Sequence, residues 1–249
     1  MTHQISHSPH FLGHRLQRLS AAFLDFLFPP PCVACRKPGA AVCAACAQAV
    51  QPVGATICDS CGRPQPYAVR QCTQCQQQAT APLQGVRIAA LYTSPLREMI
   101  HAFKYNQQPE LAVPLARYLV ALVQTDPWQD VFQSIDGVVP VPLYRARYQE
   151  RGYNQAELLA SAFCRSVQYP LRSAWLVRQR STHSQVGLTA AERQHNVQDA
   201  FVAANAVLEK RILLIDDVYT TGATMRACAQ AALNVGATAV YGLALACPC

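Results

Sequence analysis

Four C-x-x-C pairs carry the clearest chemistry in this sequence and use eight of its twelve cysteines. A C-x-x-C pair offers two thiolates from one tight turn, and two such pairs complete the tetrahedral ligand set of a structural zinc ion. The spacing predicts two successive zinc ribbons, while pairing of the first C-x-x-C with the third stays open on spacing alone. The two successive sets are Cys32, Cys35, Cys43 and Cys46, and Cys58, Cys61, Cys72 and Cys75.

Both predicted zinc ions are structural. Because protein thiolates fill all four positions, neither ion keeps an open position for water or substrate. Residues 29–80 are rich in Cys, Pro, Gln and Gly and lack the long apolar periods that a hydrophobic core needs. Zinc binding contributes about 10–16 kcal/mol in small zinc fingers, which is enough to order such a segment. Thiols used for metal rather than for disulfides indicate a reducing, cytoplasmic setting.

Residues 211–224, with the sequence R-I-L-L-I-D-D-V-Y-T-T-G-A-T, join a predicted strand to a predicted helix. The apolar residues 212–215 predict a buried strand that ends at two carboxylates, Asp216 and Asp217. Backbone N–H groups at the start of the following helix attract phosphate, because they lie at the positive end of the helix dipole. The predicted phosphate-binding residues are Thr220, Thr221, Gly222, Ala223 and Thr224.

The two carboxylates would repel a phosphate, so we expect them to bind another part of the same ligand. Vicinal ribose hydroxyls, which donate hydrogen bonds, and Mg²⁺, which prefers oxygen ligands, both suit adjacent carboxylates. The chain has no G-x-x-x-x-G-K-[ST] sequence, which argues against an ATPase of the P-loop kind.

The basic residues are mostly arginine. The net charge is +7, and 18 of the 21 basic residues are Arg, whose planar group binds phosphate with two bonds. This composition indicates a phosphorylated or nucleic-acid partner, or a basic surface that is simply solvated.

The acidic strand end and its threonine loop resemble the signature of type I phosphoribosyltransferases. Further motifs extend the likeness: F-K-Y at 103–105, V-P-V-P at 139–142 and R-G-Y-N-Q at 151–155. With the cysteine pairs ahead of them, these motifs resemble the ComF/GntX family over roughly residues 29–246. That family joins an N-terminal zinc ribbon region to a phosphoribosyltransferase-like domain and is associated with natural competence and the use of external DNA.

The resemblance implies roles for individual residues. It implies that the two acids bind the ribose, and the threonine loop the 5-phosphate, of phosphoribosyl pyrophosphate held with Mg²⁺. Arg151, Gly152 and Asn154 would lie at the diphosphate, Arg180 would begin a flap that closes over the site, and Lys104 would contact the bound ligands. The implied catalytic residues are Asp216, Asp217, Arg151 and Arg180.

Three functions are consistent with these residues. The first is a protein that binds phosphoribosyl pyrophosphate and handles imported single-stranded DNA, for which the family suggests a competence helicase as partner. The second is a nucleobase phosphoribosyltransferase of salvage or biosynthesis. The third is a nucleic-acid-binding module whose transferase domain is a relic.

Beyond residue 82, predicted strands alternate with predicted helices, and these elements must position the site residues. Apolar runs predict strands at 86–92, 137–141, 174–177, 211–215 and 238–246. Helical periods occur at 95–105, 109–124, 154–167 and 223–235, with a helical turn at 190–196. This alternation predicts an α/β fold with a mainly parallel sheet and flanking helices.

The sequence divides into three predicted parts. A tail with an amphipathic helix occupies 1–28, the double zinc ribbon 29–80 and the phosphoribosyltransferase-like domain 83–249. No apolar stretch is long enough for a membrane span.

Overall fold

The computed structural model describes residues 29–78, 81–125, 128–179 and 200–248. The predicted amphipathic helix before residue 29, the helical turn at 190–196 and Arg180 lie outside these ranges.

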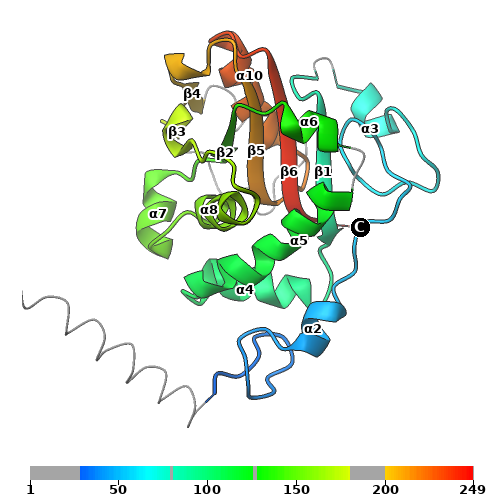
Figure 1. Cartoon of the computed structure of the whole chain (residues 1–249), viewed down its shortest axis with the longest axis vertical. Helices are drawn as coiled ribbons and strands as arrows, with labels where there is room; N and C mark the ends of the chain where they lie inside the picture. Colours follow the sequence, from blue (N-terminus) through cyan, green and yellow to red (C-terminus); the bar gives the residue numbers. More distant parts are fainter. Residues whose placement is uncertain (1–28, 79–80, 126–127, 180–199, 249) are drawn as a thin grey trace, which may run out of the picture.

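Within the described residues, a parallel sheet of four strands forms the centre of the molecule (Figure 1). The strands are β1 (Gly85–Leu91), β2 (Gly137–Pro140), β5 (Arg211–Val218) and β6 (Ala239–Cys247), in the order β1-β6-β5-β2. Every neighbouring pair is parallel. Their nearly continuous burial is typical of parallel strands that are covered on both faces.

Alternation along β5 divides the core between two faces of the sheet. Leu213 and Ile215 belong to one buried cluster, together with side chains of α4 (Leu96–Tyr105), α5 (Ala112–Thr125) and α8 (Gln155–Val167). Ile212 and Leu214 belong to the other, with side chains of α10 (Ala223–Asn234). The predicted α/β fold with flanking helices is confirmed.

Shorter elements lie around this frame. They are α6 (Gln129–Gln133), α7 (Arg145–Arg151), the antiparallel pair β3 (Leu176–Arg178) and β4 (Phe201–Ala203), and 3-10 turns at Pro109–Leu111, Ser173–Trp175 and Asn205–Val207. The sequence analysis did not predict α6, α7 or β4. The 3-10 turn also delays the start of β3, which was expected at residue 174.

The two halves of the cysteine-rich segment pack against opposite faces of the sheet. The first half contains α2 (Ala44–Gln48), and its Val33 and Val50 join the core of α4 and α5. The second half contains α3 (Thr73–Gln76), and its Cys58 and Cys61 join the core on the α10 side. In Figure 1, α2 lies below α4, and α3 lies to the right of β1.

No helix within the described ranges is long and apolar enough to span a bilayer.

Candidate functional site

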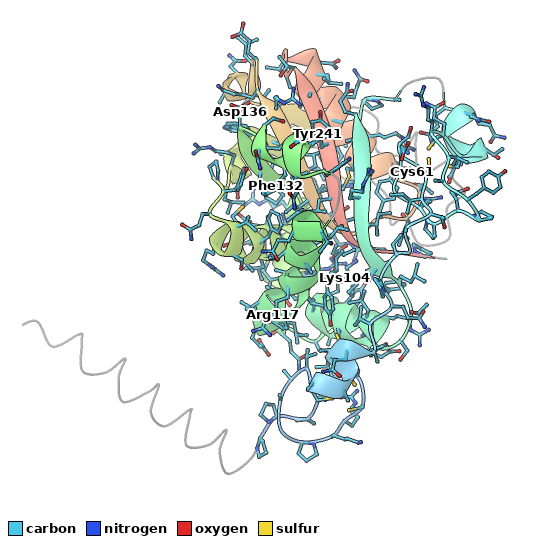
Figure 2. All side chains as sticks on the ribbon, turned by 45° about the vertical axis from the view of Figure 1, so that its right-hand side comes forward. Cys61, Lys104, Arg117, Phe132, Asp136 and Tyr241 are labelled. Carbon is cyan, nitrogen blue, oxygen red and sulfur yellow. The ribbon has the colours of Figure 1, made fainter. Side chains whose placement is uncertain are left out.

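An open cleft of about 830 Å³ lies at the carboxyl ends of the parallel strands. Its walls come from the end of β5, the residues after β2 and β6, the helix α7 and the starts of α8 and α10. Figure 2 shows Lys104 toward this end of the sheet and Asp136 and Tyr241 toward the opposite end. Open α/β sheets generally bind ligands beyond the carboxyl ends of their strands.

Most of the predicted site residues line this one cleft. Gly152 and Thr221 are not among the described residues that line it, and Arg180 lies outside the described ranges. The predicted residues in the lining are Lys104, Arg151, Asn154, Asp216, Asp217, Thr220, Gly222, Ala223 and Thr224.

The two neighbouring aspartates lie on β5 itself, which continues past its predicted end to Val218. Because strand side chains alternate, Asp217 lies on the α4 side of the sheet and Asp216 on the α10 side. Lys104 Nζ on α4 is 2.9 Å from Asp217 Oδ1. The backbone N–H of Asp217 donates to Asp216 Oδ1 at 2.8 Å. The cleft therefore holds Asp217 paired with Lys104, and next to it Asp216, whose Oδ1 accepts a backbone hydrogen bond.

Burial changes the pKa values of both Asp216 and Lys104. Burial, followed by repulsion from Asp217, raises the pKa of Asp216 to about 7, against the opposing attraction of Lys104. Burial lowers the pKa of Lys104, but the attraction of Asp217 outweighs it and leaves that pKa above its usual value. Lys104 is thus a fixed positive charge beside the acids, whereas Asp216 changes charge near neutral pH.

The loop between β5 and α10 has backbone donors that pair with no described residue. Gly222 has φ +75°, in the left-handed region, and precedes the first residue of α10. Arg226 Nη1 donates to the Thr221 carbonyl at 2.8 Å, which fixes the turn from behind. Among the described residues, no acceptor bonds the backbone N–H of Thr220, Thr221 or Gly222. These donors lie at the start of a helix of 12 residues, where an anion is stabilised.

Arg151 also lines the cleft. It ends α7, and Gly152 follows in the left-handed conformation with φ +81°. Arg151 Nη1 donates to Gln155 Oε1 at 2.8 Å, and its guanidinium lies 5.1 Å from the ring centre of Tyr105. Arg151 Nε and Gln155 Nε2 are buried donors without a partner among the described residues. Buried unpaired donors indicate a place where an acceptor on a ligand fits.

Asn154 has a clear structural task. Its Oδ1 accepts from the backbone N–H of Ala156 at 3.1 Å and caps α8, and its Nδ2 donates to the Val141 carbonyl at 3.1 Å. The side chain thus joins the end of β2 to the start of α8. Direct contact of Asn154 with a ligand stays a prediction.

Sequence reasoning missed Arg178. This residue ends β3, lines the cleft, and lies with its guanidinium 5.4 Å from the Phe201 ring centre. Burial lowers its pKa, against the attraction of Cys228 and Asp216. The predicted strand at 174–177 stopped one residue short of Arg178, and nothing in the sequence showed that this strand ends beside the cleft.

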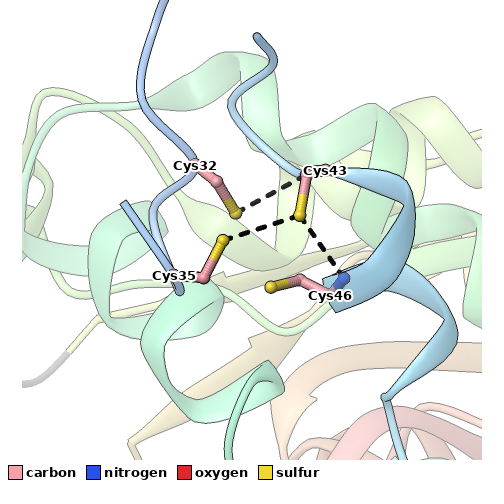
Figure 3. A group of neighbouring side chains, drawn as sticks. All are labelled: Cys32, Cys35, Cys43 and Cys46. Carbon is pink, nitrogen blue, oxygen red and sulfur yellow. Dashed lines mark hydrogen bonds between the residues drawn. The ribbon is translucent and has the colours of Figure 1, made fainter. Parts of the chain in front are cut away.

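The cysteines form two separate sets of four, as the successive pairing predicted. Figure 3 shows Cys32, Cys35, Cys43 and Cys46 converging, and the sulfur atoms in each set lie within 4.8 Å of one another. The Sγ atoms of Cys35 and Cys43 are 3.7 Å apart, and those of Cys61 and Cys72 are 3.8 Å apart. Tetrahedral ligands at the usual Zn–S length lie about 3.8 Å apart, so both sets fit structural zinc.

Comparison with known proteins supports the description of the zinc ribbons and identifies relatives of the whole chain. Residues 23–76 match a family model described as a double zinc ribbon domain. The chain is 33% identical over 216 residues to the DNA utilization protein YhgH of Escherichia coli, covering 85% of this chain and 94% of that protein. It is 31% identical to Competence protein F of Haemophilus influenzae, covering 82% and 90%, and 28% identical to Competence protein ComFC of Bacillus subtilis, covering 82% of each.

Solved structures show a likeness of fold alone. A glutamine phosphoribosylpyrophosphate amidotransferase from B. subtilis is 17% identical with a TM-score of 0.40, covering 58% of this chain and 30% of that one. A hypoxanthine phosphoribosyltransferase from Trypanosoma cruzi is 11% identical with a TM-score of 0.32, covering 58% and 78%.

Proposed function

Because the chain belongs to the ComF family of competence and DNA utilization proteins, we propose that its cleft binds phosphoribosyl pyrophosphate with Mg²⁺. The protein then acts in the handling of imported single-stranded DNA. The observation that carries this proposal is that no described residue pairs with the backbone N–H groups of residues 220–222, and that Thr220 and Gly222 line the same cleft as the acidic end of β5.

Each part of the ligand has a complementary group. The N–H groups before α10, which no described residue accepts from, suit the 5-phosphate, because an anion accepts from several donors at once there. The oxygens of Asp216 and Asp217 suit the vicinal ribose hydroxyls, which donate. Arg151, whose buried Nε has no partner in the described part of the chain, suits the diphosphate.

Lys104 removes an electrostatic obstacle. Two carboxylates beside a polyanion would oppose its binding, and the Lys104 ammonium at 2.9 Å offsets the charge of Asp217. Mg²⁺ bound to the diphosphate would offset further charge and would find oxygen ligands at Asp216. When bound, the ion would also stabilise the negative charge of a departing diphosphate.

The ribbons have a separate part in this proposal. Two closed thiolate sites order the cysteine-rich segment and require a reducing compartment, which supports a cytoplasmic location. Single-stranded DNA is the proposed macromolecular ligand, and a competence helicase, which the family resemblance suggests, is the proposed protein partner.

Calorimetric titration of the full chain with phosphoribosyl pyrophosphate and Mg²⁺ tests the binding step. We expect the Asp216→Asn/Asp217→Asn variant to bind at least roughly tenfold more weakly, because several charged hydrogen bonds are lost. The control is Asp136→Asn at the opposite end of the sheet, where Asp136 Oδ2 accepts from the Arg211 N–H at 2.8 Å. Equal binding by all three proteins would refute the proposal.

Release of diphosphate separates the proposed role from the nucleobase transferase. The protein is incubated with phosphoribosyl pyrophosphate and each of a panel of bases, and diphosphate is measured. Rapid release with one base would favour the transferase, whereas binding without base-dependent release favours the role in DNA handling.

A further inference from the structure

The second zinc ribbon reaches the loop of residues 220–222 through Tyr219. Tyr219 follows β5, is 4% exposed, and belongs to the same buried cluster as Cys58 and Cys61. A Cβ atom on Gly222 would lie 2.2 Å from the Tyr219 hydroxyl oxygen. The tyrosine therefore packs directly against Gly222, and the position of its ring limits where this loop can lie.

Arg63 joins this tyrosine to the metal ligands. Its guanidinium lies 5.7 Å from the centre of the Tyr219 ring, within the range of a cation–π contact. Its Nη1 also donates to Gln74 Oε1, and Gln74 lies between Cys72 and Cys75 in α3. The Arg63 carbonyl accepts from the Cys58 N–H at 2.9 Å. One residue thus contacts both C-x-x-C turns of the second site and the residue beneath Gly222.

The second zinc ribbon packs closely against strand β1, which fixes its position relative to the sheet. Gly62 has φ +70°, and a Cβ at this residue would lie 2.5 Å from the Val86 carbonyl oxygen of β1. Only glycine allows this approach, which brings the turn of Cys61 to Arg63 against the edge of the sheet.

The first ribbon provides a natural comparison. Lys37 stands two residues after its C-x-x-C, as Arg63 does, and its carbonyl accepts from the Cys32 N–H at 2.8 Å. The Lys37 side chain is exposed, and the first ribbon packs on the opposite face of the sheet. The two ribbons thus share a local geometry, but among the described contacts only the second reaches the cleft.

We propose that the second zinc ribbon positions the phosphate loop through Arg63 and Tyr219, so that metal occupancy of this site regulates ligand affinity in the cleft. The inference rests on the proposed function for the identity of the ligand. Arg63 is a positioning residue, because it acts through Tyr219 and Gly222.

The test compares Arg63→Ala with Lys37→Ala in the full chain. Affinity for phosphoribosyl pyrophosphate with Mg²⁺ is measured by calorimetry, zinc content by elemental analysis, and the Gly222 N–H resonance by NMR without ligand. We expect Arg63→Ala to keep two zinc ions, shift the Gly222 resonance and weaken binding roughly tenfold. Arg63→Lys should restore most of the affinity, and Lys37→Ala should change none of these readouts.

A second pair of variants tests the metal itself. Cys72→Ser should lower affinity by a similar factor, whereas Cys43→Ser in the first site should leave it unchanged. If the Arg63→Ala protein loses zinc, the Tyr219→Leu variant is tested in its place, since this change removes the ring and leaves every metal ligand in place.

The outcomes separate the two proposals. Wild-type affinity and an unmoved Gly222 resonance in Arg63→Ala and Tyr219→Leu would overturn the coupling and leave the proposed function standing. If the wild-type chain binds no phosphoribosyl pyrophosphate, the proposed function fails, and the Gly222 resonance still decides whether the ribbon positions the loop.

Discussion

Lys104 and Asp217 form an ion pair between a helix on one face of the sheet and the end of an inner strand, with 2.9 Å between Nζ and Oδ1. Both side chains are largely buried, so each depends on the other for compensation of its charge. The pair also fixes the end of α4 against the cleft, and it supplies the positive charge that a polyanionic ligand needs beside two acids.

Loss of this lysine should destabilise the fold. Lys104→Met keeps an apolar stem but leaves the Asp217 carboxylate without its partner. We expect the free energy of unfolding to fall by about 2 kcal/mol, since both groups border the cleft rather than the deep core. Urea denaturation measures the change. Lys210→Met removes an exposed lysine 4.0 Å from Asp136 and should cost less than about 0.5 kcal/mol, so equal losses would contradict this account.

Stability should fall as pH rises toward neutrality. The pKa of Asp216 is raised from 3.8 to about 7, so between these values the folded chain keeps a proton that the unfolded chain has lost. The contribution of Asp216 to the free energy of unfolding of the ligand-free protein should therefore decrease from pH 4 to pH 7 and stay constant above that pH. Denaturation at several pH values measures this slope. Asp216→Asn should flatten it, and an unchanged slope in that variant would refute the assignment to Asp216.

Gly222 should be far less replaceable than Gly152, although both have positive φ. No described residue lies within 4 Å of a Cβ placed on Gly152, whereas one on Gly222 would meet Tyr219 at 2.2 Å. Gly152→Ala should cost about 1 kcal/mol of backbone strain, and Gly222→Ala should cost clearly more and abolish ligand binding. Thermal denaturation and calorimetry compare the two variants, and similar behaviour would argue against close packing beneath the loop.

Each zinc site should empty independently of the other. Two complete sets of four thiolates predict two zinc ions per chain by elemental analysis. Because no cysteine is shared, replacing Cys43 and Cys46 together by serine should leave one ion, as should replacing Cys72 and Cys75. Loss of both ions from either double variant would contradict independent sites.

Local chemistry was readable from the sequence, and contacts across the sheet were not. Each C-x-x-C pair and the D-D-V-Y-T-T-G-A-T segment hold their functional residues within a short stretch of chain. Residue types alone were therefore enough to predict the zinc sites and the phosphate-binding loop. Periodicity predicted the long elements but placed the end of β5 before Asp216, because acidic residues are unusual inside a buried strand.

Residues brought together from distant segments left no such signal. Nothing in the sequence places Arg178 beside Asp216, or Arg63 against Tyr219, because these neighbours are set by the packing of separate elements. The attachment of the two ribbons to opposite faces of the sheet was invisible for the same reason.

The most direct test of the central claim is a crystal structure of the full chain with phosphoribosyl pyrophosphate and Mg²⁺. The account predicts the 5-phosphate within hydrogen-bond distance of the N–H groups of Thr220, Thr221 and Gly222, the ribose hydroxyls at Asp216 and Asp217, and the diphosphate toward Arg151. A ligand bound elsewhere, or a cleft that stays empty at saturating concentration, would contradict it.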